Sequence, residues 1–204
     1  MTDDASLKIT LQTGDALIIV DLQNDFLPGG SLAVPRGEQV IGPLNKVIFL
    51  FTEKKLPIFA TRDWHPAGHV SFMAQGGPWP QHCVQETKGA FFASDLKIPC
   101  QARIVSKGTN QGQDNYSGFE GTDLDSQLCN LQVGRLFVGG LAQDVCVKST
   151  VLDACRLGYK VFVLQDGTRP VNLKPDDGEK AFNQMEEAGA RIINTGQLYG
   201  KIEE

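Results

Sequence analysis

The sequence predicts an α/β protein with a mainly parallel sheet and helices on both faces, in a single domain over residues 1–204. Short apolar runs rich in β-branched residues alternate along the chain with segments whose apolar residues recur at helical spacing. Strands that are apolar on both sides suit a parallel sheet buried on both faces. The length of 204 residues, with 41% hydrophobic and 21% charged residues, is ordinary for one globular α/β unit.

The expected elements follow one another in order. The run ALIIVDL at 16–22 predicts the first strand, because it is short, apolar and rich in β-branched residues. A helix is expected over 37–55, ending before Pro57, and its apolar residues at helical spacing are Val40, Ile41, Leu44, Val47, Ile48 and Phe51. Further strands are expected at 57–63, 103–108, 135–141, 160–166 and 191–195. Further helices are expected at 122–132, 144–158 (with Gly158 as the stop) and 176–189.

The segment from Trp64 to Ala102 interrupts this alternation. It has weak periodicity and many glycine, proline and aromatic residues, which is typical of a long loop. It also contains all three histidines of the chain, His65, His69 and His82. Loops of this length inside a compact domain are usually functional, so we expect this one to contribute to a site.

Composition and charge exclude several classes of partner. The net charge is −5 and like charges form no long run, which argues against nucleic acid or an anionic membrane as the main partner. The start MTDDASLK lacks the apolar core of a secretory signal, and the longest apolar runs are far shorter than the roughly 20 residues that span a bilayer. The five cysteines are odd in number and form no C-x-x-C pair, which indicates a reduced, cytoplasmic protein.

Reactive side chains fall at the carboxyl ends of the predicted strands. The first strand ends in Asp21, the second in Asp63 and the third in Lys107, while Cys146 lies in the first turn of the helix after the fourth. In an open parallel sheet, ligands bind beyond the carboxyl ends of the strands. We therefore expect these four side chains to gather at one edge of the sheet.

Cys146 is the candidate nucleophile of this group. Its place at a helix N-terminus, near Lys107, predicts a lowered thiol pKa. Asp21 can take the proton of the thiol and return it to a leaving amine, while backbone N–H groups of LAQDVC stabilise an oxyanion. Each residue also has a plain structural alternative: a small buried cysteine, a capping aspartate and a solvated surface lysine.

Asp63, His65 and His82 are candidate metal ligands. Asp63 and His65 point the same way if the strand stays extended, and His82 can supply the third ligand. One carboxylate and two imidazoles with open positions suit a single catalytic divalent ion, Zn²⁺ in the first place, with Fe²⁺ or Mn²⁺ as alternatives. The structural alternative is that histidines in an aromatic loop only make hydrogen bonds, which is the role we expect for His69.

Six motifs together resemble the nicotinamidases of the isochorismatase-like hydrolase superfamily. They occur in the family's order, from residue 20 to about 154: VDLQNDF, TRDWHPAGHVSF, WPQHC, KG, YSGFEG and GGLAQDVCVKSTVLDA. The Asp, Lys and Cys pattern is shared by the superfamily, whereas the D-x-H…WP-x-HC set is typical of its nicotinamidase (pyrazinamidase) branch. The resemblance implies the isochorismatase-like fold and the hydrolysis of nicotinamide to nicotinate and ammonia, a step of NAD salvage.

Residue by residue, the resemblance implies these roles. The catalytic triad consists of Asp21, Lys107 and Cys146. The metal, which binds the pyridine nitrogen, is held by Asp63, His65 and His82. The substrate ring is enclosed by Phe26, Trp79 and Tyr116, and the oxyanion hole is formed by the amides of Ala142 and Cys146. A cis peptide is expected at Leu141–Ala142. In some members the residue at the place of His69 also contacts the metal, so its role stays open. Activity on pyrazinamide is expected at the family level.

One residue departs from the family pattern, and two other functions remain as alternatives. Gln143 stands where threonine is usual, beside the oxyanion loop, and removes no reacting group. The first alternative is another cysteine amidohydrolase of the superfamily, acting on a carbamoyl or ureido compound with the same triad. The second is a binding or scaffold protein on the same fold, which the presence of all three triad residues disfavours. The expected partner is a small molecule, and a homo-oligomer is allowed.

Overall fold

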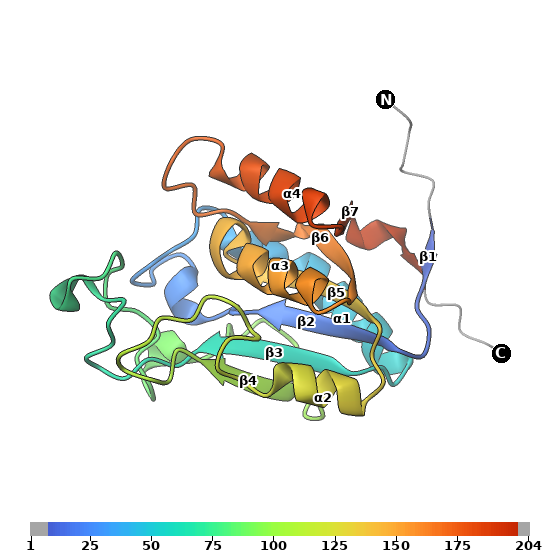
Figure 1. Ribbon diagram of the computed structural model, residues 1–204, viewed down its shortest axis with the longest axis horizontal. Coiled ribbons are helices and arrows are strands. Elements are labelled where there is room, and N and C mark those ends of the chain that lie inside the picture. The colour runs from blue at the N-terminus through green and yellow to red at the C-terminus, as the bar shows by residue number, and fades with distance from the viewer. Residues whose placement is uncertain (1–7, 200–204) are drawn as a thin grey trace.

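A computed structural model describes residues 8–199 of the chain (Figure 1). The ends of the predicted domain, residues 1–7 and 200–204, lie outside the described residues, as does nearly all of the N-terminal segment in which no secretory signal was expected. Among the described residues, no helix is long and apolar enough to cross a membrane.

Six parallel strands form the central sheet, in the order β4-β3-β2-β5-β6-β7. Their bounds are Asp15–Val20 (β2), Ile58–Asp63 (β3), Arg103–Lys107 (β4), Arg135–Leu141 (β5), Lys160–Arg169 (β6) and Arg191–Ile193 (β7). Each matches a strand predicted from an apolar run, although β6 extends beyond its expected end. A separate pair of two-residue strands, Ile9–Thr10 (β1) and Leu198–Tyr199 (β8), was not predicted, because two residues carry no periodicity.

Helices cover both faces of the sheet, as predicted. Helix α1 (Ile41–Glu53) packs on one face, and α2 (Leu124–Asn130), α3 (Lys148–Arg156) and α4 (Asp177–Glu187) pack on the other. Two of the predicted helices begin with tighter or wider turns. The turn before α1, Gly37–Val40, is a 3₁₀ helix, and the turn before α3, Gln143–Val147, is a π-helix.

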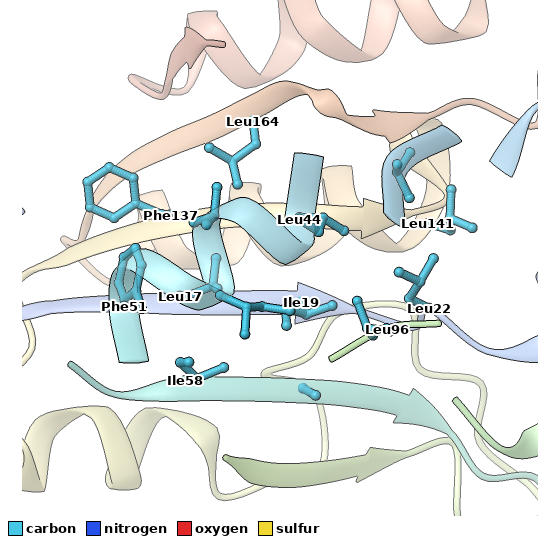
Figure 2. Packing of buried hydrophobic residues seen from close by; sticks show 14 of the residues in the cluster. Leu17, Ile19, Leu22, Leu44, Phe51, Ile58, Leu96, Phe137, Leu141 and Leu164 are labelled. Atoms are coloured by element: carbon cyan, nitrogen blue, oxygen red, sulfur yellow. The ribbon is translucent and has the colours of Figure 1, made fainter. Parts of the chain in front are cut away.

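The central strand β2 shows why the sheet needs two helical layers. Every residue of β2 is buried. Leu17 and Ile19 pack toward α1, whereas Ile18 and Val20 pack toward α3, because successive side chains of a strand point to opposite faces. Figure 2 shows the first of these layers, in which Leu44 and other side chains of α1 lie over the strands.

The order of the strands places the topological switch point of the sheet between the paired strands β2 and β5. From β2 the chain runs outward through β3 and β4, and it then returns to add β5, β6 and β7 on the other side. Ligands in open α/β sheets bind at such a switch point, outside the carboxyl ends of the strands. The loops that follow the strands gather at this end of the sheet (Figure 1). Asp21 follows β2 directly, and Cys146 lies five residues after the end of β5.

Candidate active site

Lys107 lies at the centre of the site. It is the last residue of β4 and is only 1% exposed, so the alternative of a solvated surface lysine is wrong. Its Nζ atom lies 2.9 Å from Oδ2 of Asp21, forms an ion pair with Oδ1 of Asp63 and lies 3.5 Å from Sγ of Cys146. Burial opposes the charge, but the two carboxylates and Cys146 outweigh it and raise the pKa of Lys107 well above its ordinary value. The ammonium group therefore stays charged.

Asp21 is held rigidly beside Lys107. It follows β2 with a φ of 45°, and its Oδ1 accepts a hydrogen bond of 2.6 Å from the hydroxyl of Thr61. The side chain is fully buried, and burial raises its pKa above the ordinary value, against the opposing effect of Lys107. A carboxyl group with a raised pKa in a buried site is suited to accepting and returning a proton.

Cys146 faces the same cluster from the π-helical turn. Its Sγ atom and a carboxylate oxygen of Asp21 and of Asp63 all lie within 4.8 Å of one another. The predicted lowering of its pKa is wrong: burial raises the pKa of the thiol well above its ordinary value against the opposing effect of Lys107, and the charges of Asp21 and Asp63 act in the same direction as burial. The thiol therefore keeps its proton until a neighbouring base removes it, and Asp21 is in place to do so.

Asp63, His65 and His82 form a second cluster that shares Asp63 with the first. Nε2 of His65 lies 3.7 Å from Oδ2 of Asp63, and Nε2 of His82 lies 3.9 Å from the same oxygen. The Nδ1 atoms are occupied, since that of His65 donates to the carbonyl of Gly108 at 3.0 Å and that of His82 donates to the carbonyl of Pro80 at 2.8 Å. Metal-binding histidines are oriented by a hydrogen bond of this kind on the ring nitrogen that does not bind the metal. The three side chains thus fit a divalent metal ion.

The two oxygens of Asp63 serve the two clusters separately. Oδ1 pairs with Lys107, and Oδ2 lies between the Nε2 atoms of His65 and His82. Burial alone would raise the pKa of Asp63, but Lys107 and the two histidines hold it well below its ordinary value. A permanently charged carboxylate suits a metal ligand. Because Asp63 belongs to both clusters, it also links the Asp63–His65–His82 cluster to the group around the thiol.

Gln23 holds Asp63 in place and was missed at the sequence level. Its side-chain oxygen accepts a hydrogen bond from the backbone N–H of Asp63 at 2.8 Å. Its Nε2 donates to the carbonyls of Asp63 at 2.7 Å and of Ala90 at 2.8 Å. The available signal was a polar residue inside the apolar stretch that carries Asp21, but only the fold shows that it pairs with the end of β3.

His69 lies next to the Asp63–His65–His82 cluster, and both of its ring nitrogens form hydrogen bonds with other residues of the protein. Nδ1 accepts hydrogen bonds from the hydroxyl and the backbone N–H of Ser71, at 2.7 and 3.3 Å, and Nε2 donates to the carbonyl of Gln113 at 3.1 Å. Its ring stacks on that of His65 with centroids 4.1 Å apart. These contacts support the structural role expected for His69.

Gly108 leaves the space that His65 occupies. It has a φ of +61°, and a Cβ atom built there would lie 2.4 Å from Cε1 of His65. We expect Gly108→Ala to push the ring aside and to weaken the affinity for Zn²⁺ roughly 10- to 100-fold, as loss of an orienting contact at a metal site usually does. Calorimetric titration with Zn²⁺ measures this. Gly112→Ala is the matched control, because its Cβ would meet only Oδ1 of Asn110, at 3.9 Å; equal loss in both variants would contradict the steric argument.

A pocket opens beside Cys146 and the Asp63–His65–His82 cluster. It has an empty volume of about 370 Å³, which includes the solvent-filled mouth. Its lining is mostly apolar and consists of Phe26, Leu32, Val34, Asp63, Trp79, His82, Tyr116, Ala142, Val145, Cys146 and Val171. The three aromatic residues expected to wall a substrate ring are all among them. Nε1 of Trp79 donates to the hydroxyl of Tyr116 at 2.9 Å, which fixes both rings at the pocket.

The turn expected to form the oxyanion hole also borders the pocket. The peptide bond between Leu141 and Ala142 is cis, as the resemblance implied. Ala142 and Cys146 both line the pocket, and the carbonyl of Ala142 accepts hydrogen bonds from the N–H groups of Val145 and Val147 at 3.1 and 3.0 Å. The turn is therefore ordered independently of any ligand.

Known proteins are similar to this chain over most of its length. A nicotinamidase of Escherichia coli (strain K12) is 42% identical, with 87% of this chain and 93% of the relative covered. A nicotinamidase of Saccharomyces cerevisiae is 34% identical, with 87% and 97% covered. The crystal structure of the pyrazinamidase of Pyrococcus horikoshii in complex with zinc is 46% identical, with a TM-score of 0.85 and 89% of this chain and 99% of that chain covered.

A second structural neighbour carries a ligand of the expected kind. The crystal structure of PnC1 from L. infantum in complex with nicotinate has a TM-score of 0.87 at 35% identity, and 96% of this chain and 100% of that chain are covered. The isochorismatase domain family matches residues 15–197, which include the sheet, both side-chain clusters and the pocket. On the strength of this match and of the relatives above 30% identity, the chain belongs to the isochorismatase family.

Proposed function

We propose that this protein is an amidohydrolase that converts nicotinamide to nicotinate and ammonia. The observation that carries the proposal is the shared pocket. The buried Asp21–Lys107–Cys146 cluster reaches this small, aromatic-lined space through Cys146, and the Asp63–His65–His82 cluster reaches it through Asp63 and His82. One cluster supplies a nucleophile and a base for an amide, and the other can hold an ion that binds a ring nitrogen. Similarity to the nicotinamidases of E. coli and S. cerevisiae supports the same substrate.

The reaction begins with a proton transfer from Cys146 to Asp21. Because burial keeps the thiol protonated and gives Asp21 a raised pKa, the carboxylate acts as the base at the moment of attack. The sulfur then attacks the carboxamide carbon, and the C=O double bond becomes a C–O⁻ single bond. The amides of Ala142 and Cys146 donate hydrogen bonds to this oxyanion.

Collapse of the adduct releases ammonia. Asp21 gives its proton to the amide nitrogen, the C–N bond breaks, and the acyl group stays on Cys146 as a thioester. Asp21, again a carboxylate, then takes a proton from water, whose oxygen attacks the thioester carbon. The C–S bond then breaks, and Asp21 returns its proton to the sulfur of Cys146. The product leaves as nicotinate once its carboxyl group has given up its proton to solvent.

Lys107 positions the reacting groups through its charge. Its ammonium group contacts Asp21, Asp63 and the sulfur of Cys146 from one point, so it stabilises the thiolate as it forms. It remains protonated throughout, because the surrounding negative groups raise its pKa.

The proposed metal site consists of Asp63, His65 and His82. Their donor atoms fit one divalent ion, for which we propose Zn²⁺, in line with the zinc complex of the P. horikoshii pyrazinamidase. When bound, the ion supplies a Lewis acid that holds the pyridine nitrogen of the substrate. Phe26, Trp79 and Tyr116 enclose the ring, and burial raises the pKa of Tyr116 to about 12, so its phenol stays neutral.

Ammonia release from a panel of amides tests the proposal. We expect nicotinamide and pyrazinamide to be hydrolysed, with N-carbamoyl amines at least 100-fold slower, because the flat aromatic pocket fits a ring and a ring nitrogen can meet the metal site. A chelator should abolish activity and added Zn²⁺ should restore it. Preference for the carbamoyl compounds would support the alternative amidohydrolase, and full activity of a metal-free preparation would remove the proposed role of the ion.

A further inference from the structure

A ring of hydrogen bonds joins the turn that carries Cys146 to the segment between β6 and α4. Nε2 of Gln143 donates to the carbonyl of Gly178 at 2.6 Å, and the N–H of Gly178 donates to Oδ1 of Asn172 at 2.9 Å. The carboxylate of Asp144 accepts from the N–H groups of Val171 at 2.9 Å and of Asn172 at 2.8 Å. Because Gln143 and Asp144 are neighbours in the chain, these four bonds close a ring.

Gln143 is the side chain that reaches across this ring. It is 4% exposed, so its amide is withdrawn from water and depends on Gly178 for its hydrogen bond. Gly178 is packed closely on its other side, since a Cβ atom there would lie 2.7 Å from Cγ of Pro170. The start of α4 therefore has little freedom to move away from the turn as long as Gln143 holds it.

The ring of hydrogen bonds holds one wall of the proposed substrate pocket in place. Val171 lines the pocket together with Val145 and Cys146. Its backbone N–H donates to the carboxylate of Asp144, two residues before Cys146, so the ring ties the position of Val171 to the turn that carries the reacting sulfur. Asn172 has a φ of 51°, in the left-handed region that asparagine adopts more readily than most residues other than glycine, and its two hydrogen bonds maintain it.

We propose that Gln143 is a specificity-determining positioning residue, which acts through Gly178, Asn172 and Asp144 to hold Val171 against the substrate ring. The proposal rests on the proposed function, because it concerns the fit of that substrate. A threonine at this position, the usual residue of the family pattern, is two covalent bonds shorter than glutamine and does not reach Gly178. Gln143, the residue that departs from the family pattern, thus restrains the part of the pocket wall that Val171 forms.

Gln143→Thr tests the proposal through the kinetics of two substrates. We expect KM for nicotinamide to rise about fivefold, the equivalent of one neutral hydrogen bond, with kcat within about twofold. The ratio of kcat/KM for 5-methylnicotinamide to that for nicotinamide should rise, because Val171 is then less restrained and the pocket can accommodate the extra methyl group. An unchanged KM and ratio, or a loss confined to kcat, would overturn the proposal.

Two further variants separate positioning from general destabilisation. Gln184→Thr makes the same substitution on the exposed side of α4 and should change neither constant. The double variant Gln143→Thr with Asn172→Ala should cost no more than the larger single effect, because both substitutions open the same ring. Additive effects would mean that the two residues act independently and would contradict the ring.

Amide hydrogen exchange gives a readout that does not depend on activity. The N–H groups of Val171 and Asn172 should exchange about fivefold faster in Gln143→Thr than in the wild type, and Gln184→Thr should leave them unchanged. If the wild type releases no ammonia from nicotinamide, the proposed function fails, while exchange still decides whether Gln143 holds this segment. Unchanged exchange in Gln143→Thr would overturn the positioning role by itself.

Discussion

Replacing Cys146 with alanine is expected to lower kcat for nicotinamide by a factor on the order of 10⁴ or more. The proposed reaction passes through a thioester on this sulfur, and deletion of a covalent nucleophile removes that route entirely. The loss should fall on kcat, because the side chains proposed to bind the ring and the metal remain. Ammonia release measures the rate, and calorimetric binding of nicotinamide checks that the pocket is intact.

Cys155→Ala is the matched control for this variant. Cys155 lies on α3, the helix that follows the turn of Cys146, and is half-buried. We expect Cys155→Ala to keep kcat within about twofold, since it removes a sulfur from the same region that is not a member of the proposed triad. A loss of only a few-fold in Cys146→Ala would contradict the assignment of the nucleophile, and an equal loss in both variants would point to damage to the fold.

The fold and the members of the site could be predicted because each depends on a local pattern. A strand such as β2 is buried on both faces and is therefore apolar throughout, and the first polar residue after it, Asp21, marks its carboxyl end. Parallel strands bring such ends to one edge. The same reasoning located Asp63 and Lys107 at the ends of β3 and β4, where the structure brings them together.

The electrostatics of the site could not be predicted, because they depend on distances between segments. From the sequence, Cys146 was expected to have a lowered pKa beside Lys107. In the structure, both Asp21 and Asp63 also lie within reach of the sulfur, and the complete burial of the cluster outweighs the single lysine. The number of charges around a buried group is a property of the fold and not of any one motif.

The supporting residues were missed for a related reason. Gln23 and Gly108 have no reactive group, and their importance lies in what they contact: the backbone of Asp63 in one case and the ring of His65 in the other. A glutamine or a glycine at such a position looks ordinary until the partner segment is known. Sequence patterns therefore identified the reacting groups better than the residues that hold them in place.

The three histidines are expected to differ sharply when each is replaced by alanine. His65→Ala and His82→Ala should weaken Zn²⁺ binding by roughly 100-fold or more, because each removes one of the three proposed ligands, and removal of even a supporting contact costs roughly 10- to 100-fold. His69→Ala should weaken it less than about 10-fold, since its nitrogens bond to Ser71 and Gln113 and its ring only stacks on His65. Titration of each metal-free variant with Zn²⁺ measures the three affinities.

The comparison also separates ligation from packing. His69→Ala removes a ring that contacts His65, so it is expected to lower the free energy of unfolding even though the three proposed ligands remain. His82→Ala should lower the free energy of unfolding as well, since its buried ring contacts Phe26, His65 and Phe72, but only His82→Ala should also cause a large loss of Zn²⁺ affinity, because it removes a proposed ligand. Loss of Zn²⁺ in His69→Ala as complete as in His82→Ala would show that His69 is a ligand and that the set of three is wrong.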